Sequence, residues 1–360
     1  MISIFTTKDN LESICLDSDK QPWLEMIFKL KEVFVDDDNI FAEEADTDSD
    51  PFYILDEMQV DINSSKKDFI NNIPNNPAIV LNQPSGIFLL NIPATKAFQI
   101  QKEYGVICQS TNNINHTPLT QPHVSTELLD EETGKSWKTI FGRFMNLPSN
   151  SAVIIDAHLF DEDRFDYASN CYDTKHQDGL KNITDIIECL LPNTFNGTYH
   201  IGVLITDTDI AKASNRSRTN LTNEQIALAL NDLKKVIKRN YSINIEVVFF
   251  DPNDDGHKLI HNRRIISNYF IVSALYKLAA FRNGKSKCDQ SIETFPLFEN
   301  IDTLPNPDKK EKRIRHDIKQ LTAFMLRQPN SHTALLYQNG QKTEDFLQIQ
   351  HRFFPLVQHD

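Results

Sequence analysis

From residue 151 onward, short apolar runs alternate with longer stretches in which apolar residues follow helical spacing. The apolar runs cover residues 152–155, 199–205 and 243–250. Residues 179–191 predict a helix that closes before Pro192, and a second helix is predicted from Thr222, whose spacing from Gln225 is typical of a capping box. Three apolar strands separated by two amphipathic helices predict a β-α-β-α-β unit. Its parallel sheet is expected to be covered by helices on both faces.

The first 148 residues follow a less regular pattern. Residues 94–103 predict a helix, and four short apolar runs predict strands at 52–55, 78–81, 87–90 and 105–108. We therefore expect residues 1–148 to form a separate α/β or α+β domain. Residues 149–360 are expected to form the second domain, with further β-type segments at 259–266 and 269–274 and a C-terminal helical extension from residue 309. A chain of 360 residues has room for two such domains.

The formal charge of −13 is concentrated at one end of the chain. Residues 1–57 contain sixteen Asp or Glu and four Lys, so the remaining residues carry a net charge near −1. The acidic segment 36–50 is expected to be a solvated loop, or alternatively a plug that competes with an anionic ligand. Between Gly256 and Lys287 there are seven Lys or Arg and no acid, which favours an anionic ligand there.

The cysteines and the N-terminus indicate where the protein works. Five cysteines at wide, irregular spacing fit neither a disulfide framework nor a zinc site, which favours a reducing cytoplasm. The N-terminus lacks the pattern of a signal peptide, and no apolar run has the length of about 18 residues that a transmembrane helix needs. We expect a cytoplasmic protein without a transmembrane segment.

The basic stretch contains His261, Arg263 and Asn268 in the spacing H-x-R-x-x-x-x-N. On an extended segment alternate residues share a face, so His261 and Arg263 are expected to point to one patch of solvent. An arginine offers a planar fork of donors to phosphate, and a histidine offers a hydrogen bond or a nucleophile. Neighbouring cations are expected to add to this phosphate site: Lys258, Arg264 and Lys277.

This stretch resembles the half-motif H-x-K-x-x-x-x-D of the phospholipase-D superfamily, and more closely the phospholipase-D-like C-terminal domain of MIT-domain proteins. The resemblance covers about residues 150–285. It implies a phospholipase-D-like fold in which His261 matches the nucleophile, Arg263 the phosphate-binding Lys and Asn268 the Asp. The superfamily uses two such motifs and this chain has one. The resemblance therefore leaves two alternatives, a catalytic homodimer or a binding module without chemistry.

A second candidate site uses carboxylates that follow the predicted parallel strands. They are Asp156 after the first strand, Asp207 and Asp209 after the second, and Asp251 after the third. Ligands of parallel α/β sheets gather at this edge, and several carboxylates there are expected to hold Mg²⁺ for phosphodiester cleavage. The connection at 157–178 is long enough to form a lid over the same edge, or alternatively a loop packed by its own aromatic side chains.

Together these features predict a module that binds phosphate groups, with nucleic acid preferred over lipid because no amphipathic membrane-surface helix is apparent. The alternative is a nuclease or phosphodiesterase, either a histidine-dependent homodimer or a magnesium enzyme. No cofactor is expected apart from Mg²⁺ in that second case. The expected partners are nucleic acid or another phosphate-bearing ligand, and either a second copy or a larger complex. A place in a prokaryotic antiviral defence system is a further expectation.

Overall fold

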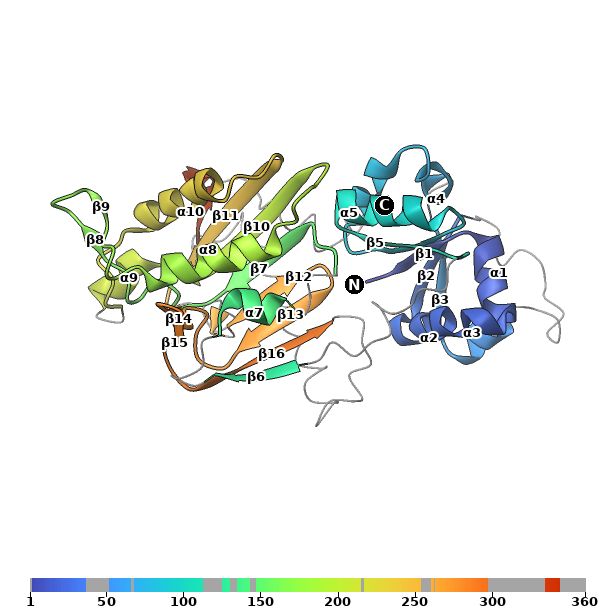
Figure 1. Cartoon of the computed structure of the whole chain (residues 1–360), viewed down its shortest axis with the longest axis horizontal. Helices are drawn as coiled ribbons and strands as arrows, with labels where there is room; N and C mark the ends of the chain where they lie inside the picture. The colour runs from blue at the N-terminus through green and yellow to red at the C-terminus, as the bar shows by residue number, and fades with distance from the viewer. Residues whose placement is uncertain are drawn as a thin grey trace.

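The residues that the structure describes form two main sheets, one of five strands and one of nine, and two short hairpins (Figure 1). The computed structural model describes residues 2–36, 52–65, 68–112, 125–129, 135–142, 147–214, 217–253, 260–261, 263–296 and 334–343. Helices flank both main sheets, so the predicted α/β class is confirmed. Within these ranges no helix combines the length and apolarity needed to cross a membrane.

The smaller sheet is parallel throughout, with the strand order β3-β2-β1-β4-β5. Its strands are β1 (Ile4–Thr6), β2 (Glu32–Val35), β3 (Asp61–Ser64), β4 (Ile87–Leu90) and β5 (Ile107–Ser110). One face is covered by α1 (Lys8–Leu16), α2 (Gln21–Leu30) and α3 (Tyr53–Glu57), and the other by α4 (Phe69–Asn72) and α5 (Ala94–Tyr104) (Figure 1). Each face has its own buried core.

Two strands predicted in this region are helical. Residues 52–55 fall largely in α3, and residues 78–81 belong to a 3₁₀ helix, Pro77–Asn82. Both are short apolar runs, for which hydrophobicity alone does not separate strand from helix. The strand predicted at 87–90 and the helix predicted at 94–103 are confirmed as β4 and α5. Strands β1, β2 and β3 were not predicted, because runs of three or four residues give little periodic signal.

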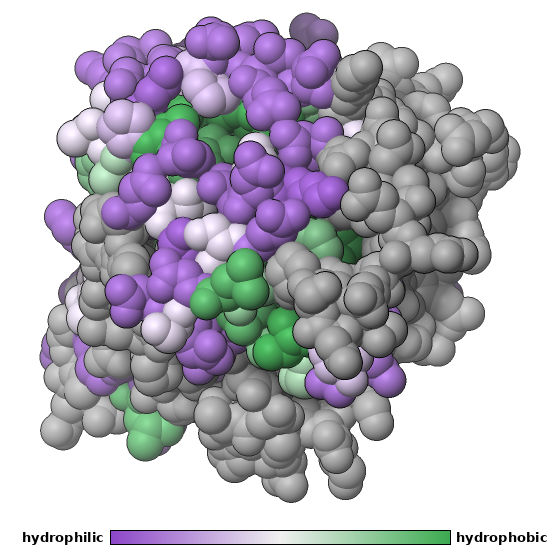
Figure 2. Space-filling view, turned by 90° about the vertical axis from the view of Figure 1, so that its right-hand side faces the viewer, coloured by the Kyte–Doolittle hydropathy of each residue, from purple (hydrophilic) through white to green (hydrophobic). Residues whose placement is uncertain are grey.

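Figure 2 shows the end of the molecule formed by the smaller sheet and its helices. Hydrophilic side chains cover most of the described surface there, and hydrophobic ones appear in small groups. The large hydrophobic side chains exposed in this part of the chain include Leu16, Ile54 and Met58.

The larger sheet has the predicted parallel core. Strands β7 (Ser151–Ile155), β10 (Thr198–Thr206) and β11 (Ser242–Phe250) are parallel neighbours, connected through α8 (Asp178–Leu190) and α10 (Asn223–Ile237). The capping box at the start of α10 is confirmed. Both crossovers lead toward the same edge of the sheet, so α8 and α10 lie side by side on one face, where α7 (Trp137–Phe141) also packs on α8 (Figure 1).

Antiparallel strands extend this core on both sides. In the full order β18-β17-β11-β10-β7-β12-β13-β16-β6, every pairing outside the core is antiparallel. The flanking strands are β12 (Arg264–Ser267), β13 (Phe270–Ala274), β16 (Gln290–Pro296), β6 (Ser125–Leu129), β17 (Ala334–Gln338) and β18 (Gln341–Thr343). Strand β6 and helix α7 precede residue 149 yet belong to this larger layer. The boundary at 148 and 149 stays a prediction, and the extension predicted from residue 309 begins outside the described residues.

A buried hydroxyl joins the two sheets. Tyr269, in the turn between β12 and β13, is fully buried, and its hydroxyl donates to the carbonyl oxygen of Gly86 at 2.7 Å. The same hydroxyl oxygen accepts from the backbone N–H of Ile107 at 3.0 Å. One side chain of the larger sheet therefore satisfies backbone groups beside β4 and in β5.

A buried amide beside β7 makes a second connection. Asn150 donates through Nδ2 to the carbonyl oxygens of Pro84 and Gly105, at 2.8 and 3.1 Å. Gly105 ends α5 with φ +60°, and a Cβ atom at this position would lie 2.2 Å from the carbonyl oxygen of Ser149. Only glycine fits this close approach between the two parts of the chain.

We expect Tyr269→Phe to lower the free energy of unfolding by about 1–3 kcal/mol, because the buried N–H of Ile107 loses its acceptor. Urea unfolding followed by circular dichroism measures this change. Tyr276→Phe is the matched control, since Tyr276 is 56% exposed, and its effect is expected to stay within about 0.5 kcal/mol. Equal unfolding midpoints for the two variants would contradict the connection.

Candidate functional site

The residues of the H-x-R-x-x-x-x-N spacing do not lie on one strand. His261 lies in an exposed turn before β12, and Arg263 lies just before the first residue of β12. The expectation of a strand over 259–266 is therefore wrong at its start. The reason is the backbone bond from the N–H of Ala157 to the carbonyl oxygen of Ile260, which fixes a turn beside the end of β7. Arg264 lies within β12 and is buried, opposite Ile155 of β7.

Asn268 lies at the other end of β12 and has a structural role. It is 1% exposed, and its Oδ1 accepts from the backbone N–H of Asn150 at 3.1 Å and from that of Ser151 at 3.0 Å. The Ser151 hydroxyl donates to the same oxygen. The four residues of β12 separate Asn268 from Arg263, which makes five steps along an extended chain, a distance of about 16 Å. The prediction that Asn268 joins these two residues at a phosphate is corrected.

The residue that lies beside His261 is His158, which is not part of the H-x-R-x-x-x-x-N spacing. It lies in the turn after β7, and its ring centroid is 5.4 Å from that of His261. Its Nδ1 forms a hydrogen bond with Asp161 Oδ2 at 2.8 Å, which fixes the ring. The sequence analysis did not include His158 among the site residues. Its position at the carboxyl end of the first strand of a parallel core was the available signal.

The carboxylate of Asp156 supports the turn that carries His158. It is fully buried at the end of β7, and its two oxygens accept from the backbone N–H groups of His158 and Leu278, at 2.9 and 2.8 Å. Burial raises the pKa of this carboxyl, while the two amides and the positive charge of Arg263 act in the opposite direction. Arg263 has a buried Nε without a hydrogen-bond partner in the described part of the chain. The described residues therefore do not satisfy every donor of its guanidinium.

The two histidines differ in their proton affinity. The hydrogen bond to Asp161 raises the pKa of His158, and the negative charges of Asp161 and Asp156 add to this effect against burial and Arg263. Burial lowers the pKa of His261, as do the nearby charges of His158 and Arg263. As pH rises, His261 therefore loses its second proton before His158 does. Neighbouring groups with opposite shifts are typical of acid and base pairs.

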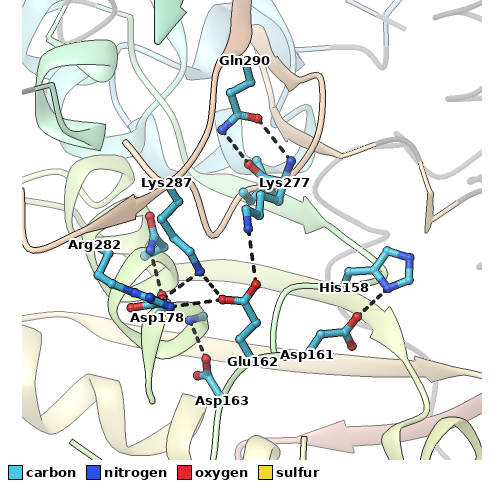
Figure 3. A network of polar contacts seen from close by, with 12 residues as sticks. His158, Asp161, Glu162, Asp163, Asp178, Lys277, Arg282, Lys287 and Gln290 are labelled. Atoms are coloured by element: carbon cyan, nitrogen blue, oxygen red, sulfur yellow. Dashed lines mark hydrogen bonds and ion pairs between the residues drawn. The ribbon is translucent and has the colours of Figure 1, made fainter. Parts of the chain in front are cut away.

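Three of the seven cations in the basic stretch are paired with acids from a distant part of the sequence. Glu162 and Asp178 lie among Lys277, Arg282 and Lys287 (Figure 3). Lys287 Nζ is 2.8 Å from Asp178 Oδ2, and both side chains are less than one tenth exposed. Lys277 Nζ lies 3.4 Å from Glu162 Oε1, so this cation is engaged by a carboxylate rather than left for phosphate. The expectation of an acid-free surface is corrected, and Lys258 lies outside the described residues.

The strand-end aspartates have capping and turn roles. Asp207 caps α9 (Thr208–Ala213), accepting from the N–H groups of Asp209 and Ile210 at 2.9 and 3.0 Å. Asp209 pairs with Lys212 at 3.0 Å. Asp251 accepts from the N–H of Asn253 at 2.8 Å, within its own turn. Among the residues that the structure places, no group of three or more His, Cys, Asp or Glu is arranged to hold a metal ion.

The connection at 157–178 contains a short hairpin, β8 (Phe165–Asp166) with β9 (Cys171–Tyr172). The ring of Phe165 packs against those of Tyr167 and Tyr172, with centroids 5.1 and 6.3 Å apart. Asp163 accepts from the first amides of α8, at Gly179 and Leu180. This arrangement matches the alternative of a loop packed by its own aromatic side chains.

Comparisons with known proteins do not add a family to these observations. No protein-family model matches the chain, and no curated protein matches it. The resemblance to the phospholipase-D superfamily therefore stays a prediction that rests on the spacing of His261, Arg263 and Asn268. His261 and Arg263 lie together at the site, whereas Asn268 lies at the other end of β12.

We expect Asn268→Ala to lower the free energy of unfolding by about 1–3 kcal/mol, because two buried N–H groups lose their acceptor. Affinity for pyrophosphate, measured by calorimetry on the folded variant, is expected to stay unchanged. Asn196→Ala, at an exposed position, is the control for stability. Normal stability together with weakened pyrophosphate binding in this variant would indicate that Asn268 contacts the ligand.

Proposed function

We propose that His158, His261 and Arg263 form a binding site for a phosphate group. The observation that carries the proposal is the buried Nε of Arg263, which has no partner among the residues that the structure describes and lies close to two histidine rings. A guanidinium beside a protonated imidazole offers charged donors in the arrangement that phosphate oxygens accept. His158 is bound to Asp161 through Nδ1, which leaves Nε2 for a ligand.

The carboxylates around the site are compatible with phosphate binding. Both oxygens of Asp156 are occupied by backbone amides, and Asp161 is bound to His158 and to the hydroxyl of Ser217. Asp161 thus holds the His158 ring in place, and the oxygens of both carboxylates already face protein donors. A phosphate group would then meet the donors of Arg263 and His158 and the ring of His261.

We expect Arg263→Ala to weaken pyrophosphate binding about tenfold or more, because a charged hydrogen bond contributes roughly 1.5–3 kcal/mol. For a polyanion, the salt dependence of binding should also become flatter. Lys285→Ala removes an exposed cation of the same basic stretch and is expected to change neither quantity. Unchanged affinity and salt slope in Arg263→Ala would contradict the site.

The affinity for phosphate is expected to fall as pH rises through the pKa of His158. Deprotonation removes a positive charge from the site, and the pKa of this ring is raised above its usual 6.5, so the loss should occur above that value. Calorimetric titrations across this range measure the effect, and His158→Gln should abolish the step. A step that persists in His158→Gln would assign it to another group.

A second candidate function is metal-independent cleavage of a phosphodiester. The contact between the two rings and their opposite pKa shifts favour it, because one chain would then supply both histidines without a homodimer. His261 would attack phosphorus, forming an N–P bond as the P–O bond to the leaving group breaks and His158 gives its proton to the leaving oxygen. Water would then attack phosphorus, give its proton to His158 and release His261.

We expect any such cleavage to continue in EDTA and to be lost in both His158→Ala and His261→Ala. His176→Ala is the matched control, since His176 forms the same bond to Asp173, three residues earlier, at a distance of 2.8 Å. Cleavage of a labelled oligonucleotide measures the effect. Binding without cleavage would retain only the first function, and cleavage that EDTA abolishes would favour the aspartates at the strand ends.

A further inference from the structure

The β8–β9 hairpin presents one aromatic ring to solvent. It projects from the end of the larger sheet at which β7 and β10 terminate, next to α9 (Figure 1). Tyr167, at its tip, is 63% exposed, although its ring has an edge contact with Phe165 and its hydroxyl donates to the carbonyl oxygen of Asn220 at 3.1 Å. The ring is therefore held in one place with much of its surface uncovered.

The hairpin itself is braced by local polar contacts. Asp166 accepts from the backbone N–H of Ala168 and from the hydroxyl of Ser169, at 2.9 and 2.7 Å. Asn220 bonds both the N–H and the carbonyl oxygen of Phe165, at 2.6 and 2.8 Å. The carboxylate next to Tyr167 is thus used within the turn, and the hairpin is fastened to the segment that ends at Asn220.

That segment leads back to the phosphate site. Ser217 donates to Asp161 Oδ1 at 3.0 Å, and the other oxygen of Asp161 holds His158. From Ser217 to Asn220 the chain advances three residues, at most about 10 Å. Arg218 lies between these two anchors and is exposed. Hydrogen bonds at Asp161 and Asn220, together with the backbone between Ser217 and Asn220, therefore connect His158 to Tyr167, with the exposed Arg218 on the way.

An exposed ring, a cation and a phosphate site along one path match the chemistry of a single nucleic-acid strand. Bases stack on aromatic rings only when their faces are free, and cations bind the phosphates between them. In a duplex the bases stack on one another, so their faces are not available to an aromatic side chain. We propose that the β8–β9 hairpin is a stacking platform and that the ligand of this site is single-stranded nucleic acid. The inference rests on the proposed phosphate site and adds the class of ligand.

The test compares ligands that differ only in their bases. Fluorescence anisotropy of the full chain is measured with a labelled oligothymidylate of about 12 nucleotides, with an abasic oligomer of equal length and with a duplex. We expect Tyr167→Ala to weaken binding of the oligothymidylate about tenfold and to leave the abasic oligomer unchanged. Tyr167→Phe keeps the ring and should bind as the wild type does. Tyr53→Ala removes a half-exposed tyrosine of the smaller sheet's layer and is the control.

The outcomes separate this inference from the proposed function. Arg263→Ala should weaken both oligomers, since it acts on phosphate. If Tyr167→Ala binds the oligothymidylate like the wild type, or if duplex binds more tightly, the stacking platform is overturned while the phosphate site stands. If the wild type binds neither the oligomers nor pyrophosphate, the phosphate site fails as well.

Discussion

The site depends on how a buried carboxylate is satisfied. Asp156 directly follows β7, the first strand of the parallel core, with no exposure to solvent, and an unsatisfied charge in such a place would cost several kcal/mol. Its two oxygens therefore bind the backbone amides of His158 and Leu278, from segments far apart in the sequence. The bond to His158 shapes the turn after β7, and the N–H of the next residue, Ala157, donates to the carbonyl oxygen of Ile260, which holds that turn beside the turn before β12. The two histidines and Arg263 meet because both turns are held at this point.

The charge around the basic stretch depends on contacts made by the tertiary fold and not on the local sequence alone. The stretch from Gly256 to Lys287 has no acid of its own, yet Glu162 and Asp178 bind three of its cations (Figure 3). The Lys287 and Asp178 pair is nearly buried, where each charge needs the other. This pairing fastens the connection at 157–178 to the segment after β13, and it leaves Arg263 as the cation of the histidine cluster.

The two sheets are joined by neutral polar groups. Tyr269, Asn150 and Asn268 each satisfy backbone atoms across the junction or at the start of β7. Gly105 allows the backbones to approach each other there. Buried hydrogen bonds of this kind have strict geometry, so they set how the smaller sheet meets the larger one. Asn268 belongs to this junction, which explains its burial better than any ligand does.

The sequence by itself determined the parallel core, the capping box of α10 and the closeness of His261 to Arg263. Each of these depends on residues near one another along the chain, whose periodicity or spacing reflects burial and hydrogen bonding. Only the tertiary structure decided that His158 stands beside His261, that Asn268 faces the other sheet, and that distant acids pair with three cations of the basic stretch. The physical reason is that these contacts depend on which strands become neighbours. The antiparallel pairing of β12 with β7 brings two turns together, and no local pattern encodes that pairing.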